Sequence, residues 1–599
     1  MVNKLLKTVF GFDEFRAFQK EAVDSILDNG DLMLILPTGG GKSLCYQLPS
    51  LVMDGVTIVI SPLIALMQDQ VAALKNNSIS ADMISSAQDY EEIQSITKKL
   101  LNNELKLLYI APERLSANGF VNLLKQININ FFVIDEAHCV SEWGHEFRSD
   151  YRNLSKLKEI FPHTPVAAFT ATATHKVQAD IINTLKLNNP TQLRGKTLRD
   201  NITINAQKRI SNGREQLVNF LSKHKGSCGI VYAFSRKEVQ RVSEFLISQG
   251  FKADAYHAGL SNDLRSRVYN DFIFEKIDIV VATIAFGMGI DKSNIRFVAH
   301  ISMPKTMENY YQEIGRAGRD GLKAETLLLF TKSDEIKRRM LIDDIQDTTY
   351  KDLLYNKLNK MYTYANSSEC RHELIAKYFD DEIEACGDIC DSCLRGEITK
   401  VDISTESMKL LSTIYRCNQS FGLVHIIDVL RGSKAQRISQ FGHENLSVYG
   451  IGKDKSKNYY NSVSDRLFEL DALEIGEFRA IKIKTLGYDI LKKKISVDID
   501  EEKLVFLPKN KSISDDVPKD EVFERFRTLR FEISCREKVP AYIVFSDKTL
   551  LEFASKLPQN KTEALDVNGV GEVKYERYGQ EFVDLCKEIK DDIMPNTQA

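Results

Sequence analysis

A glycine-rich turn follows a short apolar segment near the N-terminus. Residues 32–36 are all apolar, and residues 37–43 have the sequence PTGGGKS. A continuous apolar run is typical of a parallel strand that is buried on both faces. A glycine-rich turn between such a strand and a helix lets backbone N–H groups converge on a phosphate, while a lysine reaches the β- and γ-phosphates and a hydroxyl ligates Mg²⁺. The sequence therefore predicts a nucleotide-binding α/β domain.

The predicted phosphate loop departs from the usual spacing at one position. Leu36 stands where the GxxxxGK[ST] pattern has its first glycine. Lys42 is a candidate catalytic residue, and Ser43 is a candidate Mg²⁺ ligand. A glycine-rich turn that holds no ligand is the alternative. The candidate nucleotide-binding residues of the loop are Thr38, Gly39, Gly40, Gly41, Lys42 and Ser43.

Length and composition limit the class of protein. A chain of 599 residues exceeds what one hydrophobic core can cover and favours about four domains. The net charge of −3 gives no general attraction to nucleic acid, so such a function has to rest on local patches. No stretch reaches the about 18 apolar residues of a membrane span, and the N-terminal residues do not form a signal peptide. We expect a cytoplasmic protein without membrane contact, associated with the nucleoid if the source is bacterial.

Short apolar runs alternate with helical patterns over the first 335 residues or so. Most of these runs are continuous, as expected of parallel strands that are buried on both faces. They fall into two consecutive sets, which predicts two doubly wound α/β domains. The predicted strands of the first set are 32–36, 56–60, 107–110, 131–134 and 166–169, and those of the second set are 229–233, 253–257, 277–282 and 297–300.

Two acidic residues follow one of these predicted strands. Asp135 and Glu136 come directly after the apolar run 131–134. An acid at the end of a strand beside a phosphate loop can hold Mg²⁺, and the next acid can activate water. We therefore assign Asp135 to the metal and Glu136 to the general base, both as catalytic residues. The alternative is a helix N-cap with an incidental acid.

A pair of arginines lies near the end of the second set of strands. Residues 312–319 have the sequence QEIGRAGR, in which Arg316 and Arg319 are three positions apart. On a helix the two side chains would share one face. From a second domain this face could neutralise charge that develops on a γ-phosphate, as arginine fingers do. The alternative is a solvated basic face.

Four of the ten cysteines lie within residues 370–393. Thiolates at this density suit a closed tetrahedral zinc site. Buried free thiols and an iron–sulfur cluster are the alternatives. The candidate ligands are Cys370, Cys386, Cys390 and Cys393.

The C-terminal third contains helical patterns, a polar segment and one basic stretch. Helical patterns over 404–495 end in a strand-like segment at 480–485, and the polar residues 509–516 separate them from a helical segment at 519–591. Residues 431–460 contain six Lys or Arg against two Asp or Glu. Such an excess suits phosphate contacts on duplex DNA. A solvated basic face is the alternative.

The order of these motifs, with four further segments, resembles the RecQ family of DNA helicases over about residues 5–590. The further segments are 12–19, 61–70, 137–148 and 286–291. The resemblance implies an ATP- and Mg²⁺-dependent helicase that translocates 3′→5′ on single-stranded DNA and unwinds duplex or branched DNA in recombination, repair and replication. Structural Zn²⁺ is implied as a further cofactor. A DNA-structure-binding ATPase scaffold with little unwinding and an RNA helicase are the alternatives.

The resemblance also implies a domain order and a set of partners. The fold class is α/β multidomain, with single-stranded and duplex DNA as partners and a monomeric state. Single-strand-binding and repair proteins are candidate partners. The implied domains are two RecA-like doubly wound parallel-sheet domains at 1–200 and 201–335, a helical zinc-binding segment at 336–400, a winged helix at 401–500, a linker at 501–518, an all-helical HRDC domain at 519–591 and a disordered tail at 592–599.

Individual residues receive roles from the same resemblance. Gln19 would pair with adenine in bidentate fashion, Phe12 and Arg16 would stack on the base, and Gln312 would join the nucleotide site. Residues implied to bind DNA or to couple it to hydrolysis are Ser61, Arg114, Trp143, Phe147, Arg148, Thr172, Ser235, Arg236, His257 and Thr283, and in the winged helix Arg437, Lys453 and Lys455. Phe478 is a candidate for stacking where the strands separate.

Overall fold

The computed structural model describes residues 1–85, 88–117, 119–141, 149–287, 292–395, 399–476, 480–504 and 521–593. The chain forms two compact units. The first unit combines Met1–Leu394 with Pro518–Ala599, and the second comprises Arg395–Val517. Among the described residues, none of the helices is long and apolar enough to cross a membrane.

Within the described residues, seven parallel strands form the first sheet of unit one, in the order β3-β4-β2-β5-β6-β1-β7. The strands with the continuous apolar runs are in the interior of this sheet, as predicted. The two edge strands β3 and β7 were not predicted, because their sequences ADMI and TQLR are interrupted by polar residues. The bounds are β1 Leu32–Ile35, β2 Val56–Ile60, β3 Ala81–Ile84, β4 Leu107–Ile110, β5 Ile129–Ile134, β6 Val166–Thr170 and β7 Thr191–Arg194.

Six parallel strands of the described chain form the second sheet, in the order β10-β11-β9-β12-β13-β8. Two of them were not predicted. The edge strand β8 alternates buried and partly exposed residues, while β13 ends in an apolar run that did carry a signal. The bounds are β8 Ile202–Lys208, β9 Cys228–Tyr232, β10 Ala253–Tyr256, β11 Ile279–Ala282, β12 Ile295–His300 and β13 Ala324–Phe330.

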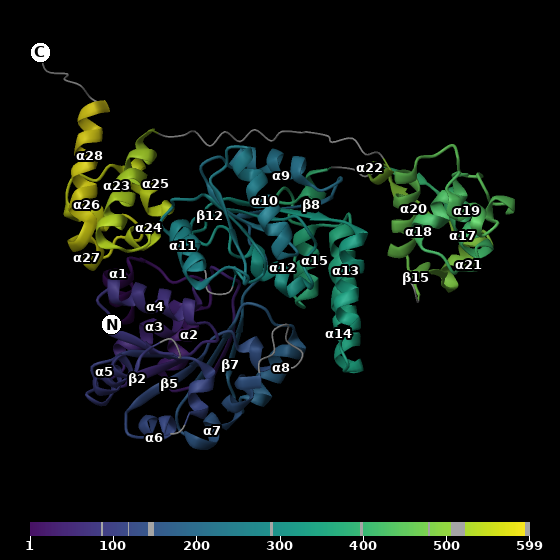
Figure 1. Ribbon diagram of the computed structural model, residues 1–599. Coiled ribbons are helices and arrows are strands. Elements are labelled where there is room, and N and C mark those ends of the chain that lie inside the picture. The colour runs from purple at the N-terminus through teal and green to yellow at the C-terminus, as the bar shows by residue number, and fades with distance from the viewer. Residues whose placement is uncertain are drawn as a thin grey trace, which may run out of the picture. The chain divides into compact units, whose positions relative to one another are not determined.

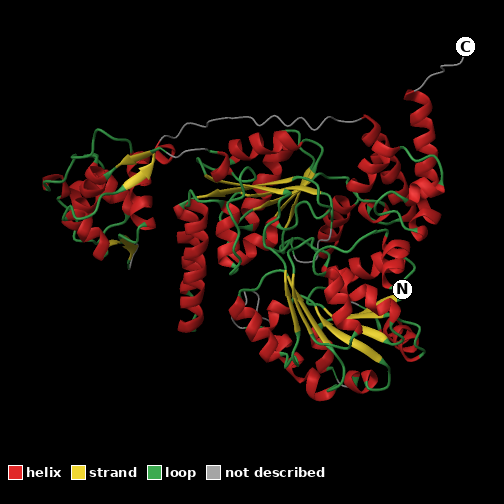
Figure 2. Cartoon of the chain, turned by 180° about the vertical axis from the view of Figure 1, so that it is seen from behind, coloured by secondary structure: helices red, strands yellow, loops and turns green. Residues whose placement is uncertain are grey.

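Helices cover both faces of each sheet (Figures 1 and 2). Around the first sheet they are α1 Val2–Phe10, α2 Gln19–Leu27, α3 Lys42–Val52, α4 Ile64–Asn76, α5 Tyr90–Leu101, α6 Phe120–Leu124, α7 Leu157–Ile160 and α8 His175–Thr184. Around the second sheet they are α9 Arg214–Leu221, α10 Arg236–Ser248, α11 Asn262–Ile273 and α12 Met307–Ile314. The alternation of strands and helices confirms the predicted doubly wound class.

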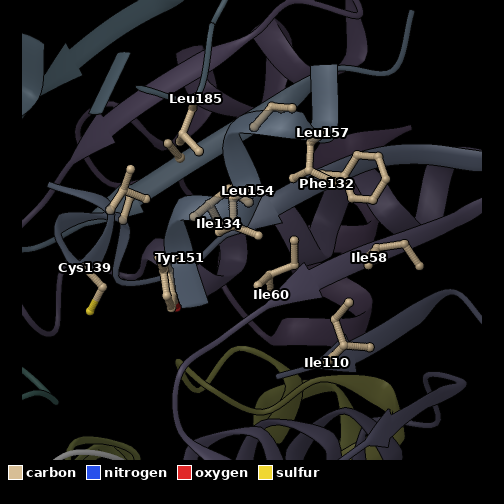
Figure 3. Close-up of a cluster of buried hydrophobic side chains, with 14 of the residues drawn as sticks. Ile58, Ile60, Ile110, Phe132, Ile134, Cys139, Tyr151, Leu154, Leu157 and Leu185 are labelled. Atoms are coloured by element: carbon tan, nitrogen blue, oxygen red, sulfur yellow. The ribbon is translucent and has the colours of Figure 1, made fainter. Parts of the chain in front are cut away.

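Neighbouring residues along the interior strand β2 belong to different hydrophobic clusters. Ile58 and Ile60 of β2 pack with Ile134 of β5 in one cluster (Figure 3), whereas Val59 and Val133 pack in another. Successive side chains of a strand point to opposite faces, so both faces of the sheet are buried. Burial on both sides is the physical reason for the continuous apolar runs in the sequence.

Helices dominate the chain after the second sheet. A pair of helices, α13 Lys332–Asp343 and α14 Thr348–Asn366, precedes α15 Arg371–Tyr378 and α16 Asp391–Leu394. The C-terminal part of unit one packs around aromatic rings, with the centroids of Phe545 and Phe582 4.9 Å apart. Its helices are α23 Glu521–Glu537, α24 Ala541–Val544, α25 Asp547–Lys556, α26 Lys561–Leu565, α27 Glu572–Lys574 and α28 Gln580–Ile593.

Unit two has its own hydrophobic core. Its elements are β14 Lys400–Asp402, α17 Ser404–Arg416, α18 Leu423–Leu430, α19 Gln436–Gln440, α20 Lys457–Glu469, β15 Leu473–Ile475, β16 Ile481–Ile483, α21 Thr485–Leu491, β17 Asp498–Asp500 and α22 Glu501–Leu504. The antiparallel pair β15–β16 stands where a winged helix has its wing. Residues 477–479 and the linker beyond Leu504 lie outside the described residues, so Phe478 has no structural assignment.

Gly229 offers a test of the packing in the second sheet. It lies on β9, and a Cβ at this position would be 2.1 Å from the ring of Phe297 on the neighbouring strand β12. We expect Gly229→Ala to lower stability by about 1–3 kcal/mol through overpacking, measured as a lower midpoint of urea denaturation. The double variant Gly229→Ala/Phe297→Leu should recover part of the loss, because the smaller side chain makes room. An unchanged midpoint in the single variant would contradict this packing.

Candidate nucleotide-binding and catalytic site

The glycine-rich loop connects the interior strand β1 to helix α3. Gly39 and Gly41 have φ values of 80° and 78°, a left-handed conformation that favours glycine. The amide of Leu36 donates to the carbonyl of Thr170 at 3.1 Å, and its side chain is buried. Leu36 therefore extends the pairing of β1 with β6, which explains why this position does not need a glycine.

Lys42 is the first residue of α3 and folds back over the loop. Its Nζ donates to the carbonyl of Leu36 at 3.1 Å. Burial lowers the pKa of the ammonium group, against the opposing effect of the nearby Glu136 and Asp135 carboxylates. The structure thus places the lysine and the two acids at one location, as the sequence predicts.

The two acids follow β5, which lies next to β2 and β6 in the sheet. The backbone N–H of Asp135 donates to the Ile60 carbonyl at 2.9 Å, and the Ser61 hydroxyl donates to its carboxylate at 3.4 Å. Burial, followed by the repulsion of Glu136, raises the pKa of Asp135 to about 7. Glu136 has a φ of 48°, a strained conformation that is concentrated at functional sites.

The acids are linked to the segment after β6. Glu136 approaches the Nδ1 atom of His138 at 3.2 Å, and the same nitrogen lies 3.0 Å from the hydroxyl of Thr170. The Thr170 hydroxyl also accepts from the amide of Thr172 at 3.3 Å. A continuous chain of polar contacts therefore joins Glu136 to the predicted coupling residue Thr172, which is buried.

The predicted helical face for the two arginines is wrong. Helix α12 ends at Ile314, and a turn that includes Gly318 with a φ of 58° carries Arg316 and Arg319. The Cα atom of Arg319 would be 3.3 Å from a Cβ at Gly39, so this arginine lies directly against the phosphate loop. Arg316 is buried, and its Nη2 would be 3.1 Å from a Cβ at Gly287.

Gly315 allows the arginine turn to approach the phosphate loop. A Cβ at Gly315 would lie 2.0 Å from the hydroxyl oxygen of Thr38. Any side chain at this position would therefore push the two loops apart. The first glycine of the predicted GRAGR segment has a steric role at the junction of the two sheets.

Two of the predicted adenine-binding residues contact the phosphate loop. Gln19 accepts a hydrogen bond from the backbone N–H of Arg16 at 2.8 Å and donates to the Gly41 carbonyl at 3.1 Å. Arg16 donates to the Gly39 carbonyl at 2.8 Å. Phe12 packs on a small apolar cluster between α1, α2 and α3, and Gln312 is a partly buried residue of α12.

The predicted DNA residues of the two sheets lie after the carboxyl ends of strands. Ser61 and Arg114 follow β2 and β4, and Ser235, His257 and Thr283 follow β9, β10 and β11. The strands in each group are neighbours in their sheet, so these positions share one edge. Ser235 caps α10 by accepting from the Glu238 amide, and the exposed Arg236 begins the same helix.

The remaining predicted DNA residues have different outcomes. Trp143, Phe147 and Arg148 lie outside the described residues. In unit two, Arg437 is exposed on α19, and Lys453 is exposed before α20. The Nζ atom of Lys455 lies 5.1 Å from the centre of the Tyr459 ring, which limits its freedom.

The predicted cysteine cluster is assembled around α15 and α16. The Sγ atoms of all four cysteines lie within 4.8 Å of one another, and no other such group of metal-binding residues occurs in the described part of the chain. The amides of Cys386 and Cys393 donate to the sulfurs of Cys370 and Cys390 at 3.2 and 3.4 Å. Four convergent sulfurs with amide donors fit a tetrahedral Zn²⁺ site. Gly387, with a φ of 77°, allows the chain to turn in the three residues between Cys386 and Cys390.

One arginine at this site was not predicted. Arg199 lies between β7 and β8 and donates to the Thr38 carbonyl at 2.5 Å. A single arginine in an irregular segment resembles any solvated surface residue, and its partners are backbone carbonyls that have no sequence pattern. No signal in the chain could have identified it.

Comparison with known families divides the chain into five matched segments. The descriptions that match are DEAD/DEAH box helicase at residues 16–181, helicase conserved C-terminal domain at 212–321, RecQ zinc-binding at 332–394, RQC domain at 397–505 and HRDC domain at 519–586. The zinc-binding match contains all four clustered cysteines, and the two findings together support a structural zinc ion.

Relatives are similar over nearly the whole chain. The ATP-dependent DNA helicase RecQ of Haemophilus influenzae is 41% identical over 603 residues, which cover 99% of this chain and 97% of the relative. The protein of the same name from Bacillus subtilis is 39% identical and covers 97% of both chains. A protein of Acanthamoeba polyphaga mimivirus whose name describes an ATP-dependent RNA helicase is 34% identical and covers 82% of this chain and 90% of the relative.

Replacing one cysteine tests the metal centre. We expect Cys390→Ser to reduce bound zinc and to lower the midpoint of thermal unfolding far more than it weakens nucleotide binding, because thiolate sites couple metal binding to folding. Zinc content by elemental analysis, thermal unfolding and nucleotide titration measure the three effects. Cys586→Ser is the matched control, because Cys586 is buried on α28 and belongs neither to the cluster nor to the nucleotide site. An unchanged unfolding midpoint after complete zinc loss would contradict a structural role.

Proposed function

Because the chain belongs to the RecQ family of ATP-dependent DNA helicases, we propose that it hydrolyses ATP with Mg²⁺ to move 3′→5′ along single-stranded DNA. Unwinding of duplex or branched DNA in recombination and repair follows from this movement. The observation that carries the proposal is the convergence of Lys42, Asp135 and Arg319 at the junction of the two sheets. The direction of movement is supported by the family resemblance.

Each residue of the site has a role that follows from its chemistry. The loop amides and Lys42 bind the phosphates. Ser43 and Asp135 would hold Mg²⁺, which would supply positive charge beside the phosphates. Glu136 takes a proton from the attacking water. Arg316 and Arg319 stabilise charge on the transferred phosphoryl group.

Adenine recognition is assigned to the turn before α2. Gln19 would pair with the base edge, with Phe12 and Arg16 beside it. Support comes from the bonds of Gln19 and Arg16 to the carbonyls of Gly41 and Gly39, since they tie this turn to the phosphate loop. Gln312 completes the proposed nucleotide site from α12.

DNA binding is assigned to the residues that follow the carboxyl ends of the strands in each sheet, and to unit two. Arg114, Arg236 and His257 are the proposed backbone contacts, together with Ser61, Ser235 and Thr283. Thr172 is buried, so its proposed role is coupling through the Thr170–His138–Glu136 contacts and not direct contact. The residues Trp143, Phe147 and Arg148 keep their proposed roles in coupling, and Arg437, Lys453 and Lys455 their proposed contacts with duplex DNA.

The proposed domain boundaries follow the predicted ones. Sheet domains at 1–200 and 201–335 are supported by the irregular segment between β7 and β8, and a zinc-binding segment at 336–400 by the cysteine cluster. The other boundaries are a winged helix at 401–500, a linker at 501–518, of which residues 501–504 are helical, an HRDC domain at 519–591 and a tail at 592–599, of which the first two residues belong to α28. We further propose a monomer that cooperates with single-strand-binding or repair proteins.

A strand-displacement assay tests the function. With ATP and Mg²⁺, we expect a DNA duplex with a 3′ tail to be unwound and a duplex with a 5′ tail to remain paired. The variant Glu136→Gln should still bind ATP but lose about 10²–10⁴-fold in turnover, because the general base is removed. Unwinding of an RNA duplex would favour the alternative of an RNA helicase, the activity that the name of the mimivirus relative describes. Absence of unwinding on every DNA substrate, with ATP hydrolysis retained, would favour a scaffold.

Gly315 tests the contact between the two loops. We expect Gly315→Ala to lower DNA-stimulated ATP turnover about tenfold or more, because its Cβ would clash with the Thr38 hydroxyl and displace the arginine turn. Thermal unfolding should change little, since neither Gly315 nor Thr38 belongs to a hydrophobic cluster. Turnover equal to that of the unmodified protein would show that this close approach is not needed for hydrolysis.

A further inference from the structure

The segment between the two sheets makes specific contacts on both sides. It runs from the end of β7 at Arg194 to the start of β8 at Ile202. Thr197, Arg199 and Asn201 alternate along it. Thr197 binds Asp381, whereas Arg199 and Asn201 both bind the turn that carries Arg316 and Arg319. These contacts are more extensive than a flexible connection between two domains requires.

Arg199 connects the phosphate loop to the arginine turn. Its Nη1 donates to the Thr38 carbonyl at 2.5 Å and to the Gly315 carbonyl at 3.4 Å. Its Nη2 donates to the carbonyls of Gly318 at 2.7 Å and Ala317 at 3.3 Å. The planar guanidinium carries five donors in a fixed fork, so one side chain can hold the carbonyls of two loops at once.

Asn201, two residues further along the segment, also binds the arginine turn. Its Nδ2 donates to the carbonyls of Gly318 and Leu322 at 2.8 and 2.9 Å, and its Oδ1 accepts from Nε of Arg199 at 3.3 Å. A Cβ at Gly318 would be 2.4 Å from this Nδ2. The glycine between the two finger arginines is therefore required by the approach of Asn201.

The other end of the segment is fixed as well. The amide and the hydroxyl of Thr197 both donate to the carboxylate of Asp381 at 2.8 Å, and the Tyr311 hydroxyl donates to the Thr197 carbonyl at 2.9 Å. Asp381 follows α15 and lies in the sequence between Cys370 and Cys386 of the cysteine cluster. Arg199 thus projects from a backbone that is held in place independently of the two loops.

The charge of Arg199 is not balanced by a bonded carboxylate. All hydrogen-bond acceptors of its side chain in the described chain are backbone carbonyls and the Asn201 amide. Burial lowers the pKa of this guanidinium to about 10, with Arg319 and Arg16 acting in the same direction. Burial and neighbouring cations are both unfavourable for this guanidinium, so its hydrogen bonds to the carbonyls of the two loops hold it in place.

We propose that Arg199 is a positioning residue for ATP hydrolysis, which holds the finger arginines of the 315–319 turn against the phosphate loop. The proposal rests on the proposed function. Arg199 acts through Arg319 and the loop carbonyls, so its loss lowers turnover while leaving the binding of ATP largely intact. A displacement of about 1 Å in a group that stabilises the transition state is enough to lower turnover about 10²-fold.

The test compares turnover with binding in Arg199 variants of the full chain. We expect Arg199→Ala to lower kcat of DNA-stimulated ATP hydrolysis about ten- to a hundredfold, with KM and the Kd of a fluorescent ATP analogue within about threefold of the unmodified protein. Arg199→Lys should recover only part of the turnover, because an ammonium cannot span both loops. Added guanidinium ion should partly rescue Arg199→Ala and leave Arg199→Lys unchanged.

Arg209→Ala is the matched control. The Arg209 side chain likewise donates to several acceptors, which are the backbone carbonyl of Ile301 and the side chains of Thr331 and Asp334 at the second sheet. We expect this variant to unfold at a lower temperature while keeping the kcat of the folded protein. An Arg199→Ala variant with normal kcat, or one whose loss lies mainly in weaker ATP binding, would overturn the proposal, the second result by indicating direct contact with the nucleotide.

Hydrogen exchange separates this proposal from the proposed function. Without nucleotide or DNA, amides 315–322 should exchange faster in Arg199→Ala than in the unmodified protein, because the turn loses its donors to the carbonyls. Equal exchange would overturn the positioning role. If the unmodified protein hydrolyses no ATP with any DNA, the proposed function fails, and hydrogen exchange still decides whether Arg199 holds the turn.

Discussion

Parallel strands bring their carboxyl ends to one edge of a sheet, and the functional side chains of this protein depend on that constraint. The phosphate loop, Ser61 and Asp135 follow β1, β2 and β5 of the first sheet. His257 and Thr283 follow neighbouring strands of the second sheet. Because the sheets are buried on both faces, their edges are the positions where polar groups can gather without disrupting a core. The residues with proposed catalytic and DNA-binding roles therefore lie at the carboxyl ends of the strands in both sheets.

The junction between the sheets is built from backbone carbonyls more than from side-chain pairs. Thr38, Gly315 and Gly318 offer carbonyls to Arg199, while Gln19 and Arg16 bind the carbonyls of Gly41 and Gly39. A loop whose carbonyls are occupied by side-chain donors can direct its N–H groups toward an anion. Of these bonds, those of Arg199 link the phosphate loop to the turn that follows α12 of the second sheet.

Predictions from the sequence succeeded where a residue's own chemistry defines its role. Lys42, Asp135 and the four cysteines carry reactive or metal-binding groups. The structure brings Lys42 and Asp135 together at the phosphate loop, and it brings the four cysteines together in a separate cluster, as predicted. The helical face for Arg316 and Arg319 was wrong because α12 ends where glycines begin. Edge strands β3 and β7 were missed because polar residues interrupt their apolar pattern, in β7 through exposure and in β3 through the buried Asp82. Arg199 could not be found, because its partners are carbonyls from loops more than 100 residues away.

The charges at the phosphate loop are mutually dependent. Burial lowers the pKa of Lys42 and raises that of Asp135 to about 7, so each group is held in an environment that disfavours its charged form. Arg319 adds positive charge beside the same loop. An anionic polyphosphate would stabilise the charged form of Lys42, and a divalent cation would stabilise the charged form of Asp135. Only the two together would stabilise both charges. We infer that this electrostatic arrangement, and not the loop sequence alone, favours the joint binding of ATP and Mg²⁺.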